Sequence, residues 1–292
     1  MEHQWGGGYA ALMFANFFNA KRAICFSPQY SIDLDIAKFD PRWMEDRKNL
    51  LSYNFMKNHI QLIELNCNVY IFYDKYFSLD NTHIKFIQNN IRISHLNLIS
   101  LNYSEHSTTK CLQEMSLLKD VVLNIFNIAE FVKLYKKSRD TSATYFTGLS
   151  NRLNKFKHFN LALNTSTTTI NKIIDTNETN IPCITLAVRC HVHNLLITKN
   201  LSKIKDFINQ LKSLKIFENI DFSLQMLQLS FIIKDEFEIL NSLDNCFHKN
   251  LMNKNKYNLL NTIIKSNIIN KNTMDKFLNN WKDKIDTNYL KI

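Results

Sequence analysis

Three of the four glycines in this 292-residue chain stand together, at positions 6, 7 and 8. Glycine has no Cβ, so a run of glycines lets the backbone turn sharply or approach a neighbouring segment closely. The next stretch, residues 9–19, is apolar nearly all round, which is typical of a buried helix. The glycine run therefore predicts a tight turn that leads into a buried helix.

Strand and helix patterns alternate over the first part of the chain. Short apolar runs predict three strands, at residues 22–27, 69–73 and 91–101. Periodic apolar residues predict further helices at residues 81–89, with Asp80 as the N-cap, and at residues 108–127. Because strands that alternate with helices form parallel sheets, residues 1–127 are predicted to be an α/β domain with about three parallel strands.

Residues 128–292 are predicted to form an all-α domain. Strand signals fade there, and comparable helix starts recur every 35 to 41 residues, near Tyr145, Leu186, Phe222 and Tyr257. This rhythm resembles degenerate tetratricopeptide-like helical hairpins, although an irregular helical bundle remains the alternative. The polar stretch at residues 164–169 predicts a loop between helices.

The net charge of +10 is unevenly distributed along the chain. Residues 1–126 hold 12 basic and 12 acidic side chains, so the whole excess lies in residues 127–292. This basic part is expected to bind a partner protein or an anionic glycan, or to be only a lysine-rich solvated helix surface. Because no dense arginine cluster with interleaved aromatic residues occurs, we expect no nucleic-acid binding.

The cysteines, the N-terminus and the apolar runs predict a cytoplasmic protein. Six cysteines occur without a CxxC pair, and no secretory signal pattern precedes them. No apolar run approaches the roughly 20 residues of a membrane span, so we expect no transmembrane segment.

No metal or cofactor is predicted either. Cys190, His191 and His193 fall short of the four well-spaced ligands of a zinc site. The chain has no glycine-rich phosphate loop and no dinucleotide-binding glycine pattern.

Residues 7–43 resemble a known family, through the run GGYAALMFANFFNAKRAICFSPQYSIDLD and the following FDPRW. The family comprises α/β-hydrolase-like proteins associated with bacterial surface-polysaccharide and glycosyltransferase genes. Its members have a nucleophile elbow of the form G-x-S-M-G-G-Y before a helix, and then a strand that ends in S-P-Q. The resemblance implies a partial α/β-hydrolase fold; it weakens over residues 69–122 and does not reach the helical part.

The resemblance also implies the positions of a catalytic triad, in the chain order serine, acid, histidine. His106, just before a predicted helix, stands where the base is expected, and Asp80 or Asp74 stands where the acid is expected. The nucleophile position falls on Trp5, whose indole cannot be activated by a histidine base. We therefore expect these residues to be vestigial and the chain to be inactive as given.

The codons that encode residues 1–5 suggest a reason for the missing serine. In a shifted frame they allow Gly-Thr-Ser-Met-Gly, and the glycine codons that follow allow an uninterrupted tract of G. We expect that the chain begins inside a longer, phase-variable gene and lacks upstream strands, while chance degeneracy of the code is the alternative.

Two functions follow from these patterns. The first is a remnant or off-phase form of a serine esterase or acyltransferase of surface-glycan biosynthesis. The alternative is a non-enzymatic helical-repeat protein that binds a partner protein or an anionic glycan through its basic half.

Overall fold

The computed structural model divides the chain into two compact units, Met1–Arg152 and Leu153–Ile292. The division falls after Arg152, later in the chain than the predicted boundary after residue 127. The structure describes residues 5–42, 44–51, 64–123, 127–214, 221–248, 252–286 and 289–290.

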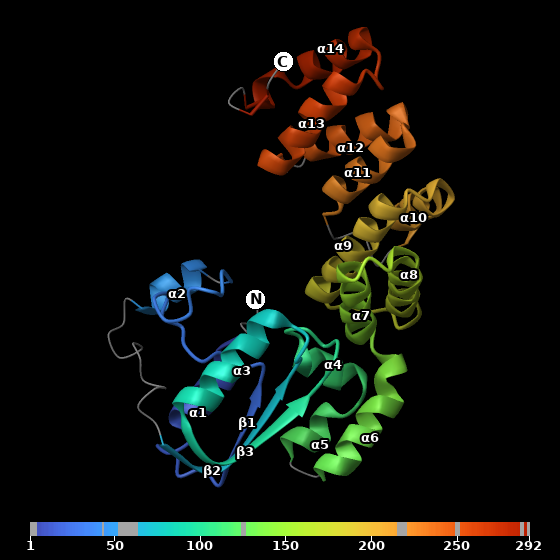
Figure 1. Cartoon of the computed structure of the whole chain (residues 1–292). Coiled ribbons are helices and arrows are strands. Elements are labelled where there is room, and N and C mark those ends of the chain that lie inside the picture. The colour runs from blue at the N-terminus through green and yellow to red at the C-terminus, as the bar shows by residue number, and fades with distance from the viewer. Residues whose placement is uncertain are drawn as a thin grey trace. The chain divides into compact units, whose positions relative to one another are not determined.

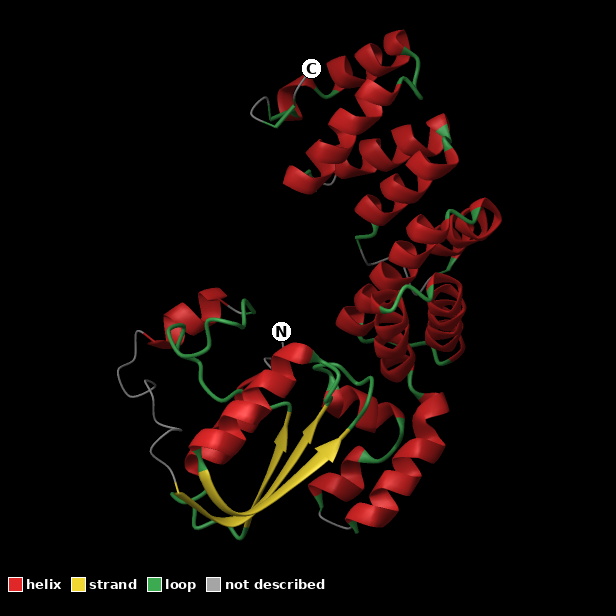
Figure 2. Cartoon of the chain, viewed as in Figure 1, coloured by secondary structure: helices red, strands yellow, loops and turns green. Residues whose placement is uncertain are grey.

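The first unit contains a three-stranded, fully parallel sheet with the strand order β1-β2-β3 (Figures 1 and 2). Its strands are β1 (Arg22–Phe26), β2 (Glu64–Tyr73) and β3 (Arg92–Ser100). The register places Val69 of β2 between Ala23 of β1 and Leu96 of β3. The predicted parallel sheet of about three strands is therefore confirmed.

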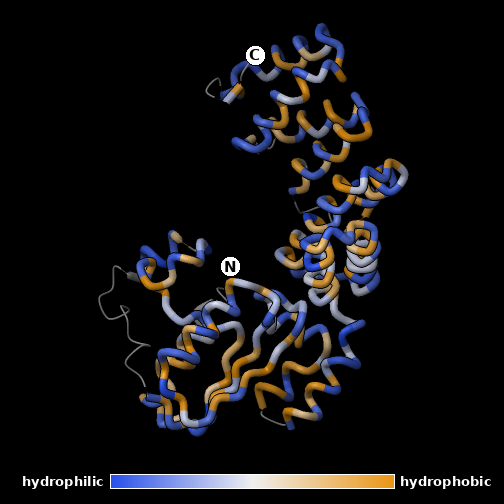
Figure 3. The backbone as a smooth tube through the Cα atoms, in the orientation of Figure 1, coloured by the Kyte–Doolittle hydropathy of each residue, from blue (hydrophilic) through white to orange (hydrophobic). Residues whose placement is uncertain are grey.

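Helices cover both faces of this sheet. The strands are accordingly apolar on both faces (Figure 3). One face packs against α1 (Trp5–Phe14) and α3 (Ser78–Asn90), with Leu12, Cys25 and Ile84 fully buried between them. Because side chains alternate along a strand, Val69 and Ile71 of β2 belong to this core, whereas Phe72 faces the opposite one.

The opposite face packs against α4 (Thr108–Glu114), α5 (Leu118–Val122) and α6 (Ile128–Ser138). A single helix was predicted over residues 108–127, but Ser116 adopts a left-handed backbone with φ 58° and separates α4 from α5. The unit also contains α2 (Met44–Leu51) between β1 and β2, a 3-10 turn at Arg139–Thr141 and the start of α7 (Ala143–Lys155).

The glycine run does not form the predicted turn before the first helix. Helix α1 begins at Trp5, so Gly7 and Gly8 lie inside it, and neither has a positive φ. A Cβ at Gly8 would lie 3.0 Å from the Phe26 carbonyl oxygen and from Pro28, whereas a Cβ at Gly7 would meet nothing within 4 Å. Gly8 therefore allows the close approach of α1 to the end of β1.

In the described residues of the second unit, all regular elements are helices. They are α8 (Phe159–Asp175), α9 (Ile181–Thr198), α10 (Leu201–Ser213), α11 (Ser223–Ile233), α12 (Glu236–His248), α13 (Lys254–Ser266), α14 (Lys271–Asn280) and a 3-10 turn at Lys282–Lys284. Helix α11 contacts its neighbours α10 and α12 and also the alternate helices α9 and α13. Contacts between alternate helices are typical of stacked helical hairpins.

Asparagine side chains start many of these helices. Asn180, Asn200, Asn253 and Asn270 are N-caps whose side-chain oxygens accept backbone N–H groups of the first turn. The asparagine-rich composition therefore supplies local start signals for regular helices.

The polar stretch at residues 164–169 lies inside α8, so the predicted loop is wrong. The hydroxyls of Thr165, Thr167 and Thr169 each donate to the carbonyl four residues earlier. These bonds satisfy the hydroxyls within the helix, and tertiary packing overrides the low helix propensity of threonine.

Among the described residues, α9 is one helix that is long and apolar enough to cross a membrane. Ile184, Val188 and Leu195 of α9 are nonetheless buried within the protein. Such burial is also typical of a core helix in a globular protein.

Candidate functional site

The candidate site lies at the carboxyl edge of the sheet, where β2 and β3 end. Asp74 directly follows β2, Asp80 stands in the first turn of α3, and His106 lies in the loop between β3 and α4. Ligand sites of open parallel sheets commonly form at this edge, because the connecting loops meet there. The structure therefore places all three predicted residues in one region.

His106 and Asp80 form a hydrogen-bonded pair. His106 Nδ1 lies 2.9 Å from Asp80 Oδ2 and 3.0 Å from Oδ1. The carboxylate is buried, whereas the imidazole is 21% exposed. Because Nδ1–H donates to the carboxylate, the lone pair of the neutral ring lies on Nε2, the arrangement that a histidine base requires.

The sequence predicted Asp80 as the N-cap of α3, and this prediction is wrong. The N-cap is Phe77, and Asp80 stands at the third position of the helix. Unpaired N–H groups and the helix dipole favour negative charge in this first turn. The helix therefore stabilises the ionised carboxylate that faces His106.

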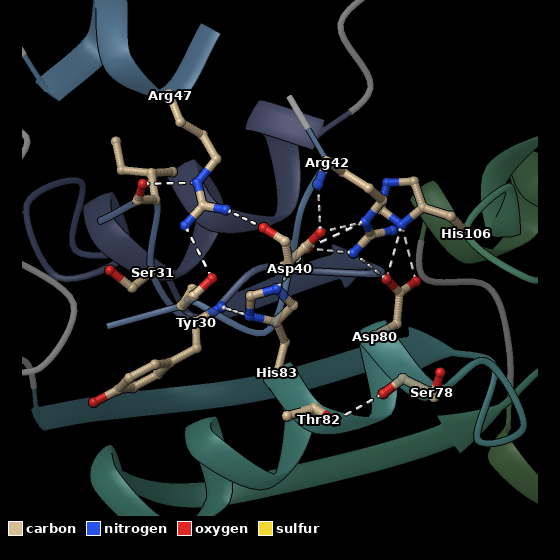
Figure 4. A network of polar contacts seen from close by, with 12 residues as sticks. Tyr30, Ser31, Asp40, Arg42, Arg47, Ser78, Asp80, Thr82, His83 and His106 are labelled. Atoms are coloured by element: carbon tan, nitrogen blue, oxygen red, sulfur yellow. Dashed lines mark hydrogen bonds and ion pairs between the residues drawn. The ribbon is translucent and has the colours of Figure 1, made fainter. Parts of the chain in front are cut away.

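Arg42 contacts the same carboxylate from another side (Figure 4). Its Nη2 lies 2.9 Å from Asp80 Oδ1 and 2.7 Å from Asp40 Oδ2. Its Nε donates to Asp40 Oδ1 at 2.9 Å, so the guanidinium holds Asp40 with two parallel bonds. Arg42 therefore links two buried carboxylates, one of which carries the catalytic candidate His106.

Asp40 is held in turn by His83. Tyr30 N–H donates to His83 Nδ1 at 3.1 Å, so the ring hydrogen stands on Nε2 and donates to Asp40 Oδ2 at 3.0 Å. Burial alone would raise the pKa of Asp40, but the bonds from His83 and Arg42 outweigh it and lower that pKa well below its usual range. Asp40 therefore stays ionised inside the protein.

Arg47 of α2 shapes the segment that presents Asp40. Its side chain is fully buried, and its guanidinium donates to the carbonyl oxygens of Ile32, Asp33 and Asp40 at 2.6–3.0 Å. A longer bond of 3.3 Å reaches the Ala37 carbonyl, so this buried guanidinium has four backbone acceptors. Arg47 therefore helps to order the irregular segment between β1 and α2, together with His83 and Arg42.

Asp74, the other candidate acid, contacts the backbone of the loop that carries His106. Its Oδ2 accepts the N–H of Glu105 at 3.0 Å, and its Oδ1 accepts the N–H of Tyr76 at 2.8 Å. Burial raises its pKa to about 6. Of the two candidate acids, Asp80 therefore contacts the imidazole of His106, and Asp74 holds the backbone of the neighbouring Glu105.

The loop before His106 has an unusual backbone that tertiary contacts maintain. Tyr103 and Glu105 both have positive φ, at 68° and 48°, which is costly for residues with a Cβ. Tyr135 Oη donates to the Asn102 carbonyl at 2.8 Å. A Cβ at Gly148 of α7 would lie only 2.2 Å from the Tyr103 carbonyl oxygen, so α7 packs directly on this loop.

The predicted nucleophile position, Trp5, is the first residue of α1, and its side chain lies outside the described part of the structure. The following turn of α1 reaches the carboxyl edge, because Gly8 packs on Phe26 and Pro28. The start of α1 and the histidine–aspartate pair therefore belong to the same edge of the sheet.

His191 of α9 packs in the core between helices. His191 is buried, its Nδ1 lies 2.9 Å from Ser166 Oγ, and its ring packs edge-on against Phe207. Burial lowers its pKa to about 4. His191 is thus a neutral core residue that links α8, α9 and α10.

Sequence reasoning assigned no role to Asp40, Arg42, His83 or Arg47. Asp40 and Arg42 belong to the FDPRW run that carries part of the resemblance, which was the available signal. His83 and Arg47 lie within helices and gave no such signal.

The described fold defines an α/β unit with a histidine–aspartate pair at the carboxyl edge of its sheet, together with a helical unit. No known protein family, curated protein or solved structure matches this chain.

Proposed function

We propose that the first unit carries the acid–base half of an acyl-transfer site of the α/β-hydrolase type. The observation that supports this most directly is the 2.9 Å contact between His106 Nδ1 and the buried Asp80 carboxylate. Such a carboxylate keeps the imidazole in the tautomer that accepts a proton at Nε2, and it stabilises the imidazolium that forms. His106 is the base in this proposal, Asp80 orients it, and Asp74 positions the loop.

The chain as given is proposed to be inactive as a serine esterase. Trp5 stands where the resemblance expects the serine nucleophile, and an indole offers no group that a histidine base can activate. The reaction class would be that of a serine esterase or acyltransferase, and the substrate class an acylated surface glycan or a carrier-linked intermediate. Because this chain lacks the nucleophile, His106, Asp80 and Asp74 are proposed to be vestigial remains of the catalytic site.

Chemical modification tests the base. Diethyl pyrocarbonate reacts with the unprotonated nitrogen of imidazole, so it is expected to modify His106 faster than the fully buried His83. The substitution Asp80→Asn removes the charge that orients the ring, and it should slow the modification of His106 but not that of the exposed His193. Equal rates at His106 in the wild type and Asp80→Asn, measured by peptide mass spectrometry, would contradict the assignment.

A fluorophosphonate probe tests the proposed inactivity. No serine of the wild-type chain is expected to be labelled, since serine labelling requires an activated hydroxyl. Labelling that disappears in His106→Ala would show that this chain carries its own nucleophile and would overturn the inactive assignment.

The stacking of the second unit favours the alternative function, a helical-repeat interaction protein. Helix α11 contacts both α9 and α13, and stacked hairpins commonly present extended binding surfaces. The positive charge of residues 127–292 suits an acidic protein partner or an anionic glycan. Salt-sensitive binding of the full chain to an immobilised anionic polysaccharide would support this function, and its absence at low salt would count against the glycan.

A cytoplasmic location remains part of the proposal. No disulfide joins the six cysteines, all of which lie in the described part of the chain. Reduced thiols are typical of proteins in that compartment.

A further inference from the structure

A pair of phenylalanines protrudes from the first unit at the edge opposite to His106. After α1 ends at Phe14, the chain turns through residues 15–19, and Phe17 and Phe18 there are 80% and 72% exposed. Phe14 is itself partly exposed, and its ring lies 6.4 Å from that of Phe18. We call Phe14, Phe17 and Phe18 the aromatic tip.

The turn that carries the aromatic tip is well defined. Phe18 N–H donates to the Phe14 carbonyl, and Ala20 N–H donates to the Ala15 carbonyl at 2.9 Å. Asn19 takes the left-handed conformation with φ 48°, a common way to end a helix. The exposed rings are therefore held by a regular helix cap.

The aromatic tip lies at the amino edge of the sheet. Asn16 Nδ2 donates to the carbonyl of Glu64, the first residue of β2, which fixes the turn at this edge. The charged residues at the strand starts are mainly basic: Lys21, Arg22 and Arg92 are exposed there, against the single acid Glu64. Exposed aromatic rings beside basic side chains match the surface of an anionic bilayer, whose interior accepts the rings and whose headgroups attract the cations.

We propose that the aromatic tip and its basic neighbours dock the protein on an anionic membrane surface. Two protruding rings insert between lipids without any complementary pocket. A second copy of the chain fits the same feature less well, because two phenylalanine side chains bury only about 150–250 Å² each, whereas a stable interface needs about 800 Å² on each partner. The proposal is independent of the acid–base site, which lies at the opposite edge of the sheet.

Vesicle co-sedimentation of the full chain tests the proposal. The wild type is expected to bind phosphatidylcholine vesicles that contain phosphatidylglycerol more tightly than phosphatidylcholine vesicles alone. The double substitution Phe17→Ser and Phe18→Ser should weaken this binding by about tenfold or more, because the inserted apolar area is lost. Phe237→Ser is the matched control, since Phe237 of α12 is 69% exposed and lies in the other unit.

Charge reversal tests the electrostatic part. The double substitution Lys21→Glu and Arg22→Glu should weaken binding to the anionic vesicles by about tenfold, as should high salt. Lys38→Glu, which changes an exposed lysine elsewhere in the same unit, should leave it unchanged.

Three results would overturn the proposal. They are the absence of wild-type binding to anionic vesicles, equal binding to neutral vesicles, and undiminished binding of the phenylalanine double variant. A dimer that light scattering detects in the wild type and not in that variant would assign the aromatic tip to self-association instead. Circular dichroism confirms that each variant is folded, and both phenylalanine substitutions are at exposed positions that contribute little to the core.

Discussion

Gly148 of α7 lies so close to Tyr103 that a Cβ at this position would be 2.2 Å from the Tyr103 carbonyl oxygen. A carbon and an oxygen that are not bonded to each other cannot approach so closely, so α7 and the loop before His106 are packed backbone to backbone. The strained loop, with two residues of positive φ, depends on this contact. The position of His106 is thus set partly by the backbone of α7, which packs on the preceding loop.

The substitution Gly148→Ala should therefore displace the loop and destabilise the protein by about 1–3 kcal/mol, the usual cost of overpacking. It should also broaden or shift the His106 imidazole resonances in a ¹⁵N–¹H spectrum. Gly7→Ala is the matched control, because its Cβ would meet nothing within 4 Å and alanine favours a helix interior. Similar chemical denaturation curves for Gly148→Ala and the wild type would contradict the close packing.

Asp74 should make folding stability depend on pH. Burial raises its pKa to about 6, so folding favours the protonated carboxyl. The wild type should therefore gain stability relative to Asp74→Asn as the pH falls from about 7 to about 4, by up to about 3 kcal/mol at about 1.4 kcal/mol per pKa unit. Urea denaturation of both proteins across this pH range measures the difference, and a difference that stays constant with pH would refute the assignment.

His191 should also make stability depend on pH, but here the second unit should lose stability as the pH falls. Burial lowers its pKa to about 4, so the unfolded chain binds the proton more readily. The free energy of unfolding of this unit should fall as the pH drops from about 6.5 to about 4, by about 3 kcal/mol from this residue. His191→Gln should flatten that dependence, whereas His193→Gln, at an exposed position of the same helix, should not. Thermal melts followed by circular dichroism provide the comparison.

Arg42 should position Asp80, and through it His106. Lysine keeps the positive charge, but it cannot hold Asp40 with two parallel bonds and also reach Asp80, as the guanidinium does. Arg42→Lys should therefore increase the motion of the Asp80 carboxylate and reduce the fraction of His106 with hydrogen on Nδ1. Nitrogen chemical shifts of the imidazole report this tautomer directly. An unchanged tautomer in Arg42→Lys would show that α3 alone holds Asp80.

The sequence predicted the α/β part well, because its signals are local. The short apolar runs at residues 22–27 and 69–73 correspond to β1 and to part of β2. Local signals failed where packing overrides them. The stretch at residues 164–169 is helical because its hydroxyls bond within α8, and the predicted helix over residues 108–127 is interrupted at Ser116.

The candidate site was predicted in part. His106 and Asp80 were both named, because the resemblance implied their roles from chain order, with Asp74 as the alternative acid. The geometry places Asp80 on His106 and Asp74 on the backbone of Glu105. Arg47 could not be predicted, because its four carbonyl acceptors lie in an irregular segment without periodicity.

The sequence by itself determined where the three strands lie, and that chemistry-bearing residues follow two of them. Apolar runs and their periodicity act over a few residues, and they can be recognised without knowledge of any tertiary contact. Only the tertiary structure decided which carboxylate meets His106. That choice depends on contacts between residues far apart in the chain, such as Arg42 with Asp80, and on the need of every buried charge for a partner.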